Sequence, residues 1–274
     1  MIEKQRNREK YTFANINLLG KCNANCYFCL GKDIDELLSL QNQTQIHFGE
    51  WKNFKRFLDV CKKNDIKKLY ITGQNTDALI YKYFEELVEY LKNEGFLVGI
   101  RTNGYLAEQK LNLINKCNDE IGYSIHSLNP EKNYKIMGHR DFPNWEYIIP
   151  NTKPVTRVAI VVNRYNVDDF FDLVKYISKF DNVSYIQARR ISTDTRYEEM
   201  EEDIKLYEEL YNKVKKEFPK LRDFYSAEIF EIYGKEVCFW RTVQTTVNSI
   251  NYFTDGTLSE EYFVVEGYLK NMNK

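Results

Sequence analysis

The sequence predicts an α/β fold, a partial (β/α)6 TIM-type barrel followed by a short C-terminal α+β cap. Short apolar runs rich in Ile, Val, Tyr and Thr alternate with amphipathic helical patterns over residues 1–192. Such alternation calls for parallel βαβ units, which close fully or partly into a barrel. The spacing resolves six units rather than eight, so we expect the barrel to be open.

Each of the six expected strands is bounded by polar or turn residues. They span 13–19, 68–72, 97–103, 120–126, 156–163 and 184–191. Apolar residues at a spacing of three or four predict helices over 51–61, 80–91 and 170–177. After residue 192 the pattern changes to a charged helix over 198–218 and short strands within 228–241 and 245–258. We therefore expect a barrel region, 1–192, and a cap, 193–274.

The composition is that of an ordinary globular protein, since 43% of its 274 residues are hydrophobic. Its 39 Lys and Arg nearly balance 40 Asp and Glu, for a net charge of −1, which argues against a nucleic-acid partner bound through a strongly basic face. The start lacks the apolar stretch of a signal peptide, and no run approaches the ~18 apolar residues of a membrane helix. We expect a cytoplasmic protein that binds no membrane.

Three of the six cysteines lie within eight residues, directly after the first expected strand. Cys22, Cys26 and Cys29 are spaced Cys-x3-Cys-x2-Cys. Three thiolates on a short loop can bind three irons of a [4Fe–4S] cluster, which leaves the fourth iron open to a small-molecule chelate. The alternatives are a structural zinc site closed by a distant ligand such as His47, or chance clustering. Disulfides are disfavoured in a chain without a secretory signal.

This loop resembles that of the radical SAM superfamily, where Cys-x3-Cys-x-aromatic-Cys follows the first strand of a partial (β/α)6 barrel. The similarity covers roughly residues 10–192. It implies that Cys22, Cys26 and Cys29 bind a [4Fe–4S] cluster, that S-adenosylmethionine chelates the fourth iron, and that Phe28 lies near the adenine. It also implies that a flavodoxin- or ferredoxin-type protein donates the electron that releases a 5′-deoxyadenosyl radical, which abstracts a substrate hydrogen.

The second expected strand ends where the superfamily usually has Gly-Gly-Glu, a motif that accepts hydrogen bonds from the amino group of the cofactor. Gly73 matches the motif, whereas Gln74 and Asn75 depart from it. An amide oxygen still accepts such a bond, but without charge assistance. We therefore expect one weaker contact and an intact site.

Polar side chains share the inward face of several expected strands. On the fourth strand, Ser124 and His126 alternate with apolar residues, as strands of a barrel require. A polar lumen is costly unless something occupies it, and a zwitterionic cofactor would satisfy it. His126 is also a candidate catalytic residue, with a structural role as the alternative. From the inward faces and the resemblance together, the remaining cofactor-binding candidates are Asn103, Ser124, Asn163, Gln187 and Arg189.

The tail resembles the C-terminal extension of superfamily members that modify peptides, in which further cysteines hold auxiliary clusters. Here Cys238 is the single cysteine after residue 117, so we expect one cluster only. Cys238 is a candidate catalytic thiol that returns a hydrogen atom to a substrate radical, with a buried spectator as the alternative.

Three hypotheses about function follow. The favoured hypothesis is a radical enzyme that modifies a peptide or protein, and the alternative is the same chemistry on a small metabolite or nucleoside. The third is a non-catalytic protein that binds an iron–sulfur cluster or zinc, suggested by the altered residues Gln74 and Asn75.

Overall fold

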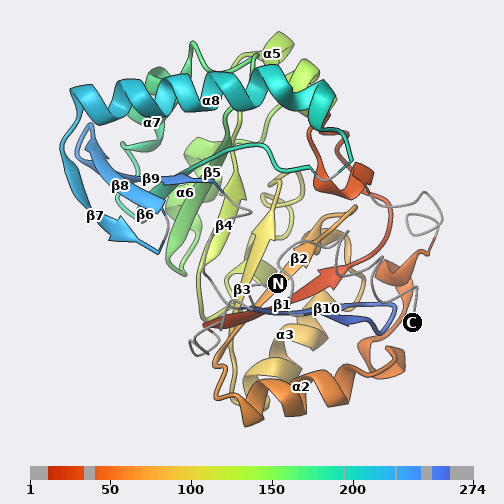
Figure 1. Ribbon diagram of the computed structural model, residues 1–274. Coiled ribbons are helices and arrows are strands. Elements are labelled where there is room, and N and C mark those ends of the chain that lie inside the picture. The colour runs from red at the N-terminus through yellow and green to blue at the C-terminus, as the bar shows by residue number, and fades with distance from the viewer. Residues whose placement is uncertain (1–11, 34–40, 194, 226, 242–248, 260–274) are drawn as a thin grey trace, which may run out of the picture.

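The computed structural model describes residues 12–33, 41–193, 195–225, 227–241 and 249–259. Its centre is one sheet of eleven strands in the order β11-β10-β1-β2-β3-β4-β5-β6-β9-β8-β7. The sheet curves with helices on its outer side and does not close on itself (Figure 1). The prediction of a partial barrel is therefore confirmed.

The six predicted strands lie side by side in sequence order, and each pair of neighbours is parallel. Their bounds differ from the predicted ones by one or two residues at most ends. They are β1 (Phe13–Leu18), β2 (Lys68–Gly73), β3 (Leu97–Thr102), β4 (Ile121–Ser124), β5 (Thr156–Val161) and β6 (Val183–Arg189).

Helices follow the strands and bury their apolar faces against the sheet. The predicted ones are α2 (Phe54–Lys63), α3 (Phe84–Asn93), α7 (Phe170–Ile177) and α8 (Tyr197–Glu217). The periodicity missed the short α4 (Leu111–Ile114), α5 (Pro130–Met137) and α6 (Trp145–Asn151). Single 3-10 turns are η1 (Leu30–Asp33), η2 (Gln43–Gln45), η3 (Phe48–Glu50) and η4 (Ala78–Ile80).

The C-terminal strands differ from the expected cap, because they join the sheet at both of its edges. They are β7 (Lys220–Phe224), β8 (Ala227–Ile232), β9 (Lys235–Trp240), β10 (Ser249–Phe253) and β11 (Leu258–Ser259). β9 pairs in parallel with β6, and β10 pairs in parallel with β1. The backbone groups that six strands alone would leave unpaired at either edge are thus satisfied. The C-terminal strands therefore extend the sheet of the barrel, and the division of the chain at residue 192 stays a prediction.

The added strands belong to the main core. Tyr252 of β10 is fully buried and stacks on Phe57 of α2, with ring centroids 5.1 Å apart. On the other edge, Phe239 of β9 packs within 5.9 Å of Phe170 of α7. Burial on this scale stabilises each aromatic ring by roughly 1.5–3 kcal/mol.

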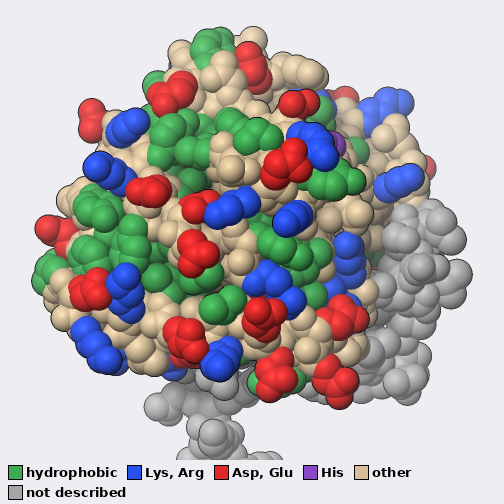
Figure 2. All heavy atoms as spheres, turned by 90° about the horizontal axis from the view of Figure 1, so that it is seen from above, with side chains coloured by type: hydrophobic (Ala, Val, Ile, Leu, Met, Phe, Trp, Pro, Cys, Tyr) green, Lys and Arg blue, Asp and Glu red, His purple; other side chains and the backbone are tan. Residues whose placement is uncertain are grey.

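Positive and negative side chains are intermingled over the face seen from above in Figure 2, in keeping with the near-zero net charge. Within the described residues, no helix combines the length and apolarity that crossing a membrane requires.

Candidate active site

A cavity of about 700 Å³ occupies the inside of the barrel. It is lined by side chains from all six strands of the barrel and by the loop that follows β1. Twelve of the fourteen site residues predicted from the sequence line this cavity. Those that line it are Cys22, Cys26, Phe28, Cys29, Gly73, Gln74, Asn103, Ser124, His126, Gln187, Arg189 and Cys238. Asn75 and Asn163 do not line it.

The cysteine loop is held against the end of α5 by its own backbone. The amide of Asn25 donates to the carbonyl of Met137 (2.9 Å), and the amide of Tyr27 donates to that of Ile136 (3.1 Å). Gly138 ends α5 with a φ of 80°, and a Cβ there would come within 3.1 Å of Asn25. A left-handed glycine therefore allows this close approach of helix and loop.

The three thiols share the cavity, are all free, and suit a group that binds thiolates. Burial raises the pKa of Cys22 to about 11 and also raises the pKa of Cys26 and Cys29, so bare thiolates would be unfavourable here. Cationic irons would displace those protons. The donor set and its open side toward the cavity fit a cluster with three protein ligands.

The closed zinc site gains no support from the geometry. Within the described part of the chain, no three His, Cys, Asp or Glu side chains converge as ligands of one ion. Thiolates that bind separate irons of a cluster need not converge in that way. His47 accepts a hydrogen bond from the amide of Gly49 and lies 3.4 Å from Glu86, and it does not line the cavity.

A buried clamp from the segment after β6 fixes the cysteine loop, and the sequence analysis did not find it. Arg196 donates to the carbonyls of Tyr27 and Cys29, both at 2.8 Å, and its Nε lies 2.6 Å from Asp33. Asp203 of α8, whose side chain is fully buried, accepts a bond from the Tyr27 hydroxyl (2.9 Å) and several from Arg164. In the sequence, one arginine before a charged helix and one aspartate within it give no sign of this role.

The turn after β2 packs directly on the cysteine loop. A Cβ on Gly73 would lie 1.7 Å from the carbonyl oxygen of Thr76, so only glycine fits. The carbonyl of Gln74 lies 3.7 Å from the Cys29 thiol, and its side-chain amide donates to Asn17 (3.0 Å). Asn75 accepts a bond from the amide of Gly20 (3.1 Å), and its buried Nδ2 has no hydrogen-bond partner among the described residues. Asn75 thus supports the loop rather than facing the cavity.

Asp77 is a further residue of the cavity wall that the sequence analysis missed. Its carboxylate accepts bonds from the Thr102 hydroxyl (2.9 Å) and the Asn103 amide (2.7 Å). Burial raises its pKa, against these donors and Lys110. Asn103 in turn donates to the side chain of Asn23 (2.8 Å) and lies 3.7 Å from the Cys22 thiol. The end of β3 is thereby joined to the cysteine loop.

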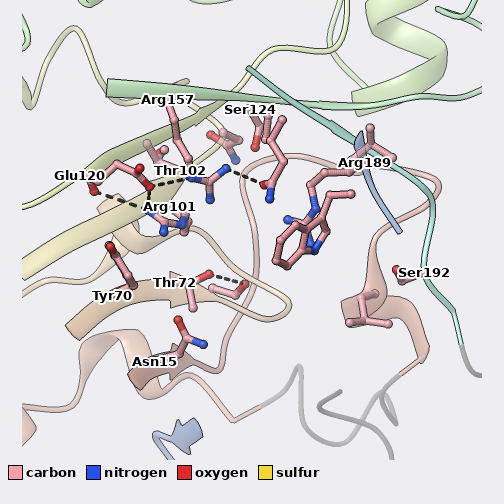
Figure 3. A pocket seen from close by; sticks show the side chains of 18 of the residues that line it. Asn15, Tyr70, Thr72, Arg101, Thr102, Glu120, Ser124, Arg157, Arg189 and Ser192 are labelled. Carbon is pink, nitrogen blue, oxygen red and sulfur yellow. Dashed lines mark hydrogen bonds and ion pairs between the residues drawn. The ribbon is translucent and has the colours of Figure 1, made fainter. Parts of the chain in front are cut away.

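The wall opposite the turn is formed by His126, Phe28, Ser124 and Arg189. The His126 ring packs edge-on against Phe28, with centroids 5.2 Å apart, and its Nδ1 accepts from the amide of Val161 (3.2 Å). Burial and the nearby Arg189 lower the pKa of His126 to about 3, so the ring is neutral. Nδ1 as acceptor leaves the proton on Nε2. Figure 3 shows Ser124 and Arg189 on neighbouring parts of this wall.

Asn163 is completely buried beyond the end of β5. Its side chain donates to the carbonyl of Val161 (2.8 Å) and accepts from the amide of Tyr165 (2.9 Å). Those bonds shape the loop after β5, which is a structural role.

The part of the cavity around Glu120, which we call its lower part, is lined by charged side chains. Arg157 donates to Glu120 (2.8 Å) and to the side chain of Gln187 (2.9 Å), and Arg101 lies 3.1 Å from the same Glu120 oxygen (Figure 3). A Cβ on Gly122, which lies between the arginines in register, would come within 2.8 Å of Arg101 and 3.2 Å of Arg157. Gly122 therefore makes room for both guanidinium groups.

Cys238 of β9 pairs in register with Gln187 and is 1% exposed. It belongs to a small apolar cluster with Ile229 and Trp240, which also line the cavity. Burial raises its pKa to about 12, so it is a neutral thiol.

With this geometry in place, residues 16–180 match the family described as the Radical SAM superfamily. The chain belongs to that superfamily, as its cysteine loop predicts. The family implies a [4Fe–4S] cluster and S-adenosylmethionine as cofactors.

Individual relatives agree with this assignment. The chain is 25% identical over 214 residues to a GTP 3′,8-cyclase of Aquifex aeolicus (strain VF5), a match that covers 74% of this chain and 64% of the relative. Streptococcus suis SuiB bound to precursor peptide SuiA superposes with a TM-score of 0.58 at 12% identity, over 93% of this chain and 60% of SuiB. TYW1 with a lysine–pyruvate adduct gives 0.51 at 18%, over 79% of this chain and 78% of TYW1. The last two likenesses show the fold.

Proposed function

We propose that this chain cleaves S-adenosylmethionine reductively at a single [4Fe–4S] cluster and abstracts a hydrogen from a substrate bound in the barrel. The observation that carries the proposal is that Cys22, Cys26 and Cys29 face one cavity, which continues into a polar lumen. When bound, the cluster and S-adenosylmethionine supply an electron and a 5′-deoxyadenosyl radical. A flavodoxin- or ferredoxin-type protein is the electron donor that we expect.

The side chains around the cysteines would hold the cofactor. Gly73 and Gln74 offer backbone carbonyls beside the cysteine loop for its amino group, and Phe28 offers an apolar face for its adenine. Arg189 has no acidic partner among the described residues and would pair with its carboxylate. Asn103 and Ser124 present polar atoms for the ribose or methionine part.

His126 would act as a fixed donor and not as an acid. Its ring is neutral, buried and held through Nδ1, so the Nε2 proton is the one available to a ligand. Cys238 would supply a hydrogen atom to a substrate radical and become a thiyl radical, which one electron from the external donor and one proton would return to the thiol. Its raised pKa keeps the S–H bond intact.

For the substrate we favour a small metabolite or nucleoside. The charged pair of arginines at the bottom of the lumen suits a small polar molecule, and the relative from Aquifex aeolicus is named for a reaction of GTP. A peptide or protein is the second proposal, and its support is the resemblance of the tail to that of peptide-modifying enzymes.

The test is anaerobic reconstitution with iron and sulfide, followed by S-adenosylmethionine and dithionite. Formation of 5′-deoxyadenosine by the wild type, and none by Cys22→Ala, is the expected result. A fully loaded wild type that forms no 5′-deoxyadenosine would instead favour the non-catalytic hypothesis.

A further inference from the structure

A shared carboxylate is the starting observation. The Oε1 atom of Glu120 serves two guanidinium groups, Arg157 at 2.8 Å and Arg101 at 3.1 Å. Arg101 has no other acidic partner in the described part of the chain, and 26% of its side-chain surface is open. One carboxylate thus stands between two permanent positive charges.

The other charges around this part of the cavity are matched among themselves. Lys68 lies 3.3 Å from Asp119, and Arg222 holds Glu236 through two bonds of 2.5 and 2.6 Å. These pairs leave the positive charge of Arg101 unbalanced among the described charges that line this region. Burial and repulsion from Arg157 lower the pKa of Arg101, because both disfavour its charged form.

Arg101 is also held in a defined orientation. Its guanidinium lies over the ring of Tyr70, 3.8 Å from the centroid, and the Tyr70 hydroxyl is fixed by Asp119 at 3.1 Å. Figure 3 shows Tyr70 and Thr72 below Arg101, all on the same side of the cavity. A stacked guanidinium that keeps an open edge is prepared for an oxyanion, since it presents parallel N–H donors without further ordering.

We propose that the substrate carries an oxyanion, a carboxylate or a phosphate, which binds at Arg101 in the lower lumen. This subsite deepens the function proposed above, because the anion would anchor the substrate on the side of the lumen away from the cysteine loop. Its reacting carbon would then point toward the cofactor.

Calorimetric titration of the anaerobic, cluster-loaded protein tests this subsite without reductant. The probes are inorganic phosphate and sodium acetate at constant ionic strength, with S-adenosylmethionine in excess to cover its own carboxylate site. We expect Arg101→Gln to weaken binding of the preferred anion by about tenfold, the scale of one charge-assisted hydrogen bond. Glu120→Gln should tighten it, since it removes the competing carboxylate. Arg56→Gln, an exposed arginine on α2, is the charge-matched control and should leave the affinity unchanged.

Opposite effects of Arg101→Gln and Glu120→Gln would support the subsite, because a purely structural network would weaken binding in both. Equal affinity in all four proteins, weaker binding by Glu120→Gln, or no binding of either probe by the wild type would overturn it. If Arg101→Gln fails to fold, the direction of the Glu120→Gln effect decides. The tighter probe assigns the substrate group as a phosphate or a carboxylate.

The parallel assay for 5′-deoxyadenosine separates the two proposals. Product formation without anion binding rejects the subsite and keeps the radical function. Anion binding with the expected pattern but no 5′-deoxyadenosine keeps the subsite and rejects the function.

Discussion

The rim and the floor of the cavity differ in the charge of the side chains that form them. The rim, which we define as the cysteine loop together with the ends of β2, β3, β4 and β6 around it, consists mainly of thiols, amides, hydroxyls and a neutral imidazole, with Asp77 and Arg189 as its charged residues. The floor, which we define as Tyr70, Arg101, Glu120, Arg157 and Gln187, is a charged network. The rim therefore suits the cofactor that the superfamily has in common, and the floor suits one particular kind of substrate.

The largest expected effect is loss of the cluster from the rim. Changing Cys22, Cys26 or Cys29 to Ala should abolish it, because no other cysteine is on that loop. Cys61→Ala, Cys117→Ala and Cys238→Ala are the controls and should keep about four irons per chain. Iron and sulfide analysis after anaerobic reconstitution measures this, and loss on removing Cys238 would contradict the single cluster.

A pH titration of stability tests whether His126 of the rim is neutral. The pKa of His126 falls from 6.5 to about 3 on folding, so the unfolded chain binds the extra proton between these values. The contribution of neutral His126 to stability is present above pH 6.5 and is lost as the pH falls toward 3, at roughly 1.4 kcal/mol per pKa unit. Denaturant unfolding of cluster-free protein should show this decline, and His126→Gln should flatten it. An unchanged slope in the variant would show that His126 is not the group responsible.

The clamp under the rim predicts a smaller effect. Asp203→Asn removes the charge that Arg164 and Tyr27 share, and should lower the free energy of unfolding by about 1.5–3 kcal/mol. The matched control is Glu202→Gln, because Glu202 pairs with the same Arg164 (2.9 Å) but is 64% exposed. The control should cost less than about 1 kcal/mol. Hydrogen exchange of the cysteine loop should rise in Asp203→Asn only, and equal exchange in both would reject the clamp.

Ser124 and Asn163 should respond differently to replacement by leucine, because only Ser124 lines the cavity. Ser124→Leu should weaken binding of S-adenosylmethionine by about tenfold or more, with the iron content unchanged, because Ser124 lines the cavity. Asn163→Leu should instead lower stability, since it leaves buried backbone groups without partners. Calorimetry and denaturant unfolding of both variants measure this, and unaltered affinity in Ser124→Leu would remove it from the site.

The smallest expected effect belongs to Asn75, which stands where the superfamily usually has Glu. Because Asn75 supports Gly20 and does not line the cavity, Asn75→Glu should change the affinity for S-adenosylmethionine by no more than about tenfold. If only Asn75→Glu forms 5′-deoxyadenosine, the motif has decayed in the wild type.

The sequence allowed the strands and most of the rim to be predicted, because both depend on local patterns. Alternation along the fourth strand correctly predicted that Ser124 and His126 face the cavity. The charged network of the floor was not predicted, because Arg101, Glu120 and Arg157 form a network only when three strands bring them together around Gly122. The same holds for Arg196 and Asp203, whose partners Asp33 and Tyr27 lie more than 160 residues away.

The pairing of β10 with β1 has a consequence for how the protein is made. The stretch that leads into the cysteine loop is bonded to residues from the far end of the chain, as the Leu19 amide to Thr254 (3.0 Å) and Asn15 to Asn251 (2.8 Å) show. Contacts separated by about 235 residues form late, because a long loop must close before they do. During synthesis, the first strand therefore gains this partner only once residues 249–253 have been made. A ribosome-bound fragment that ends before β10 should hold the cysteine loop loosely, so cluster insertion belongs after β10 has been made and has paired with β1.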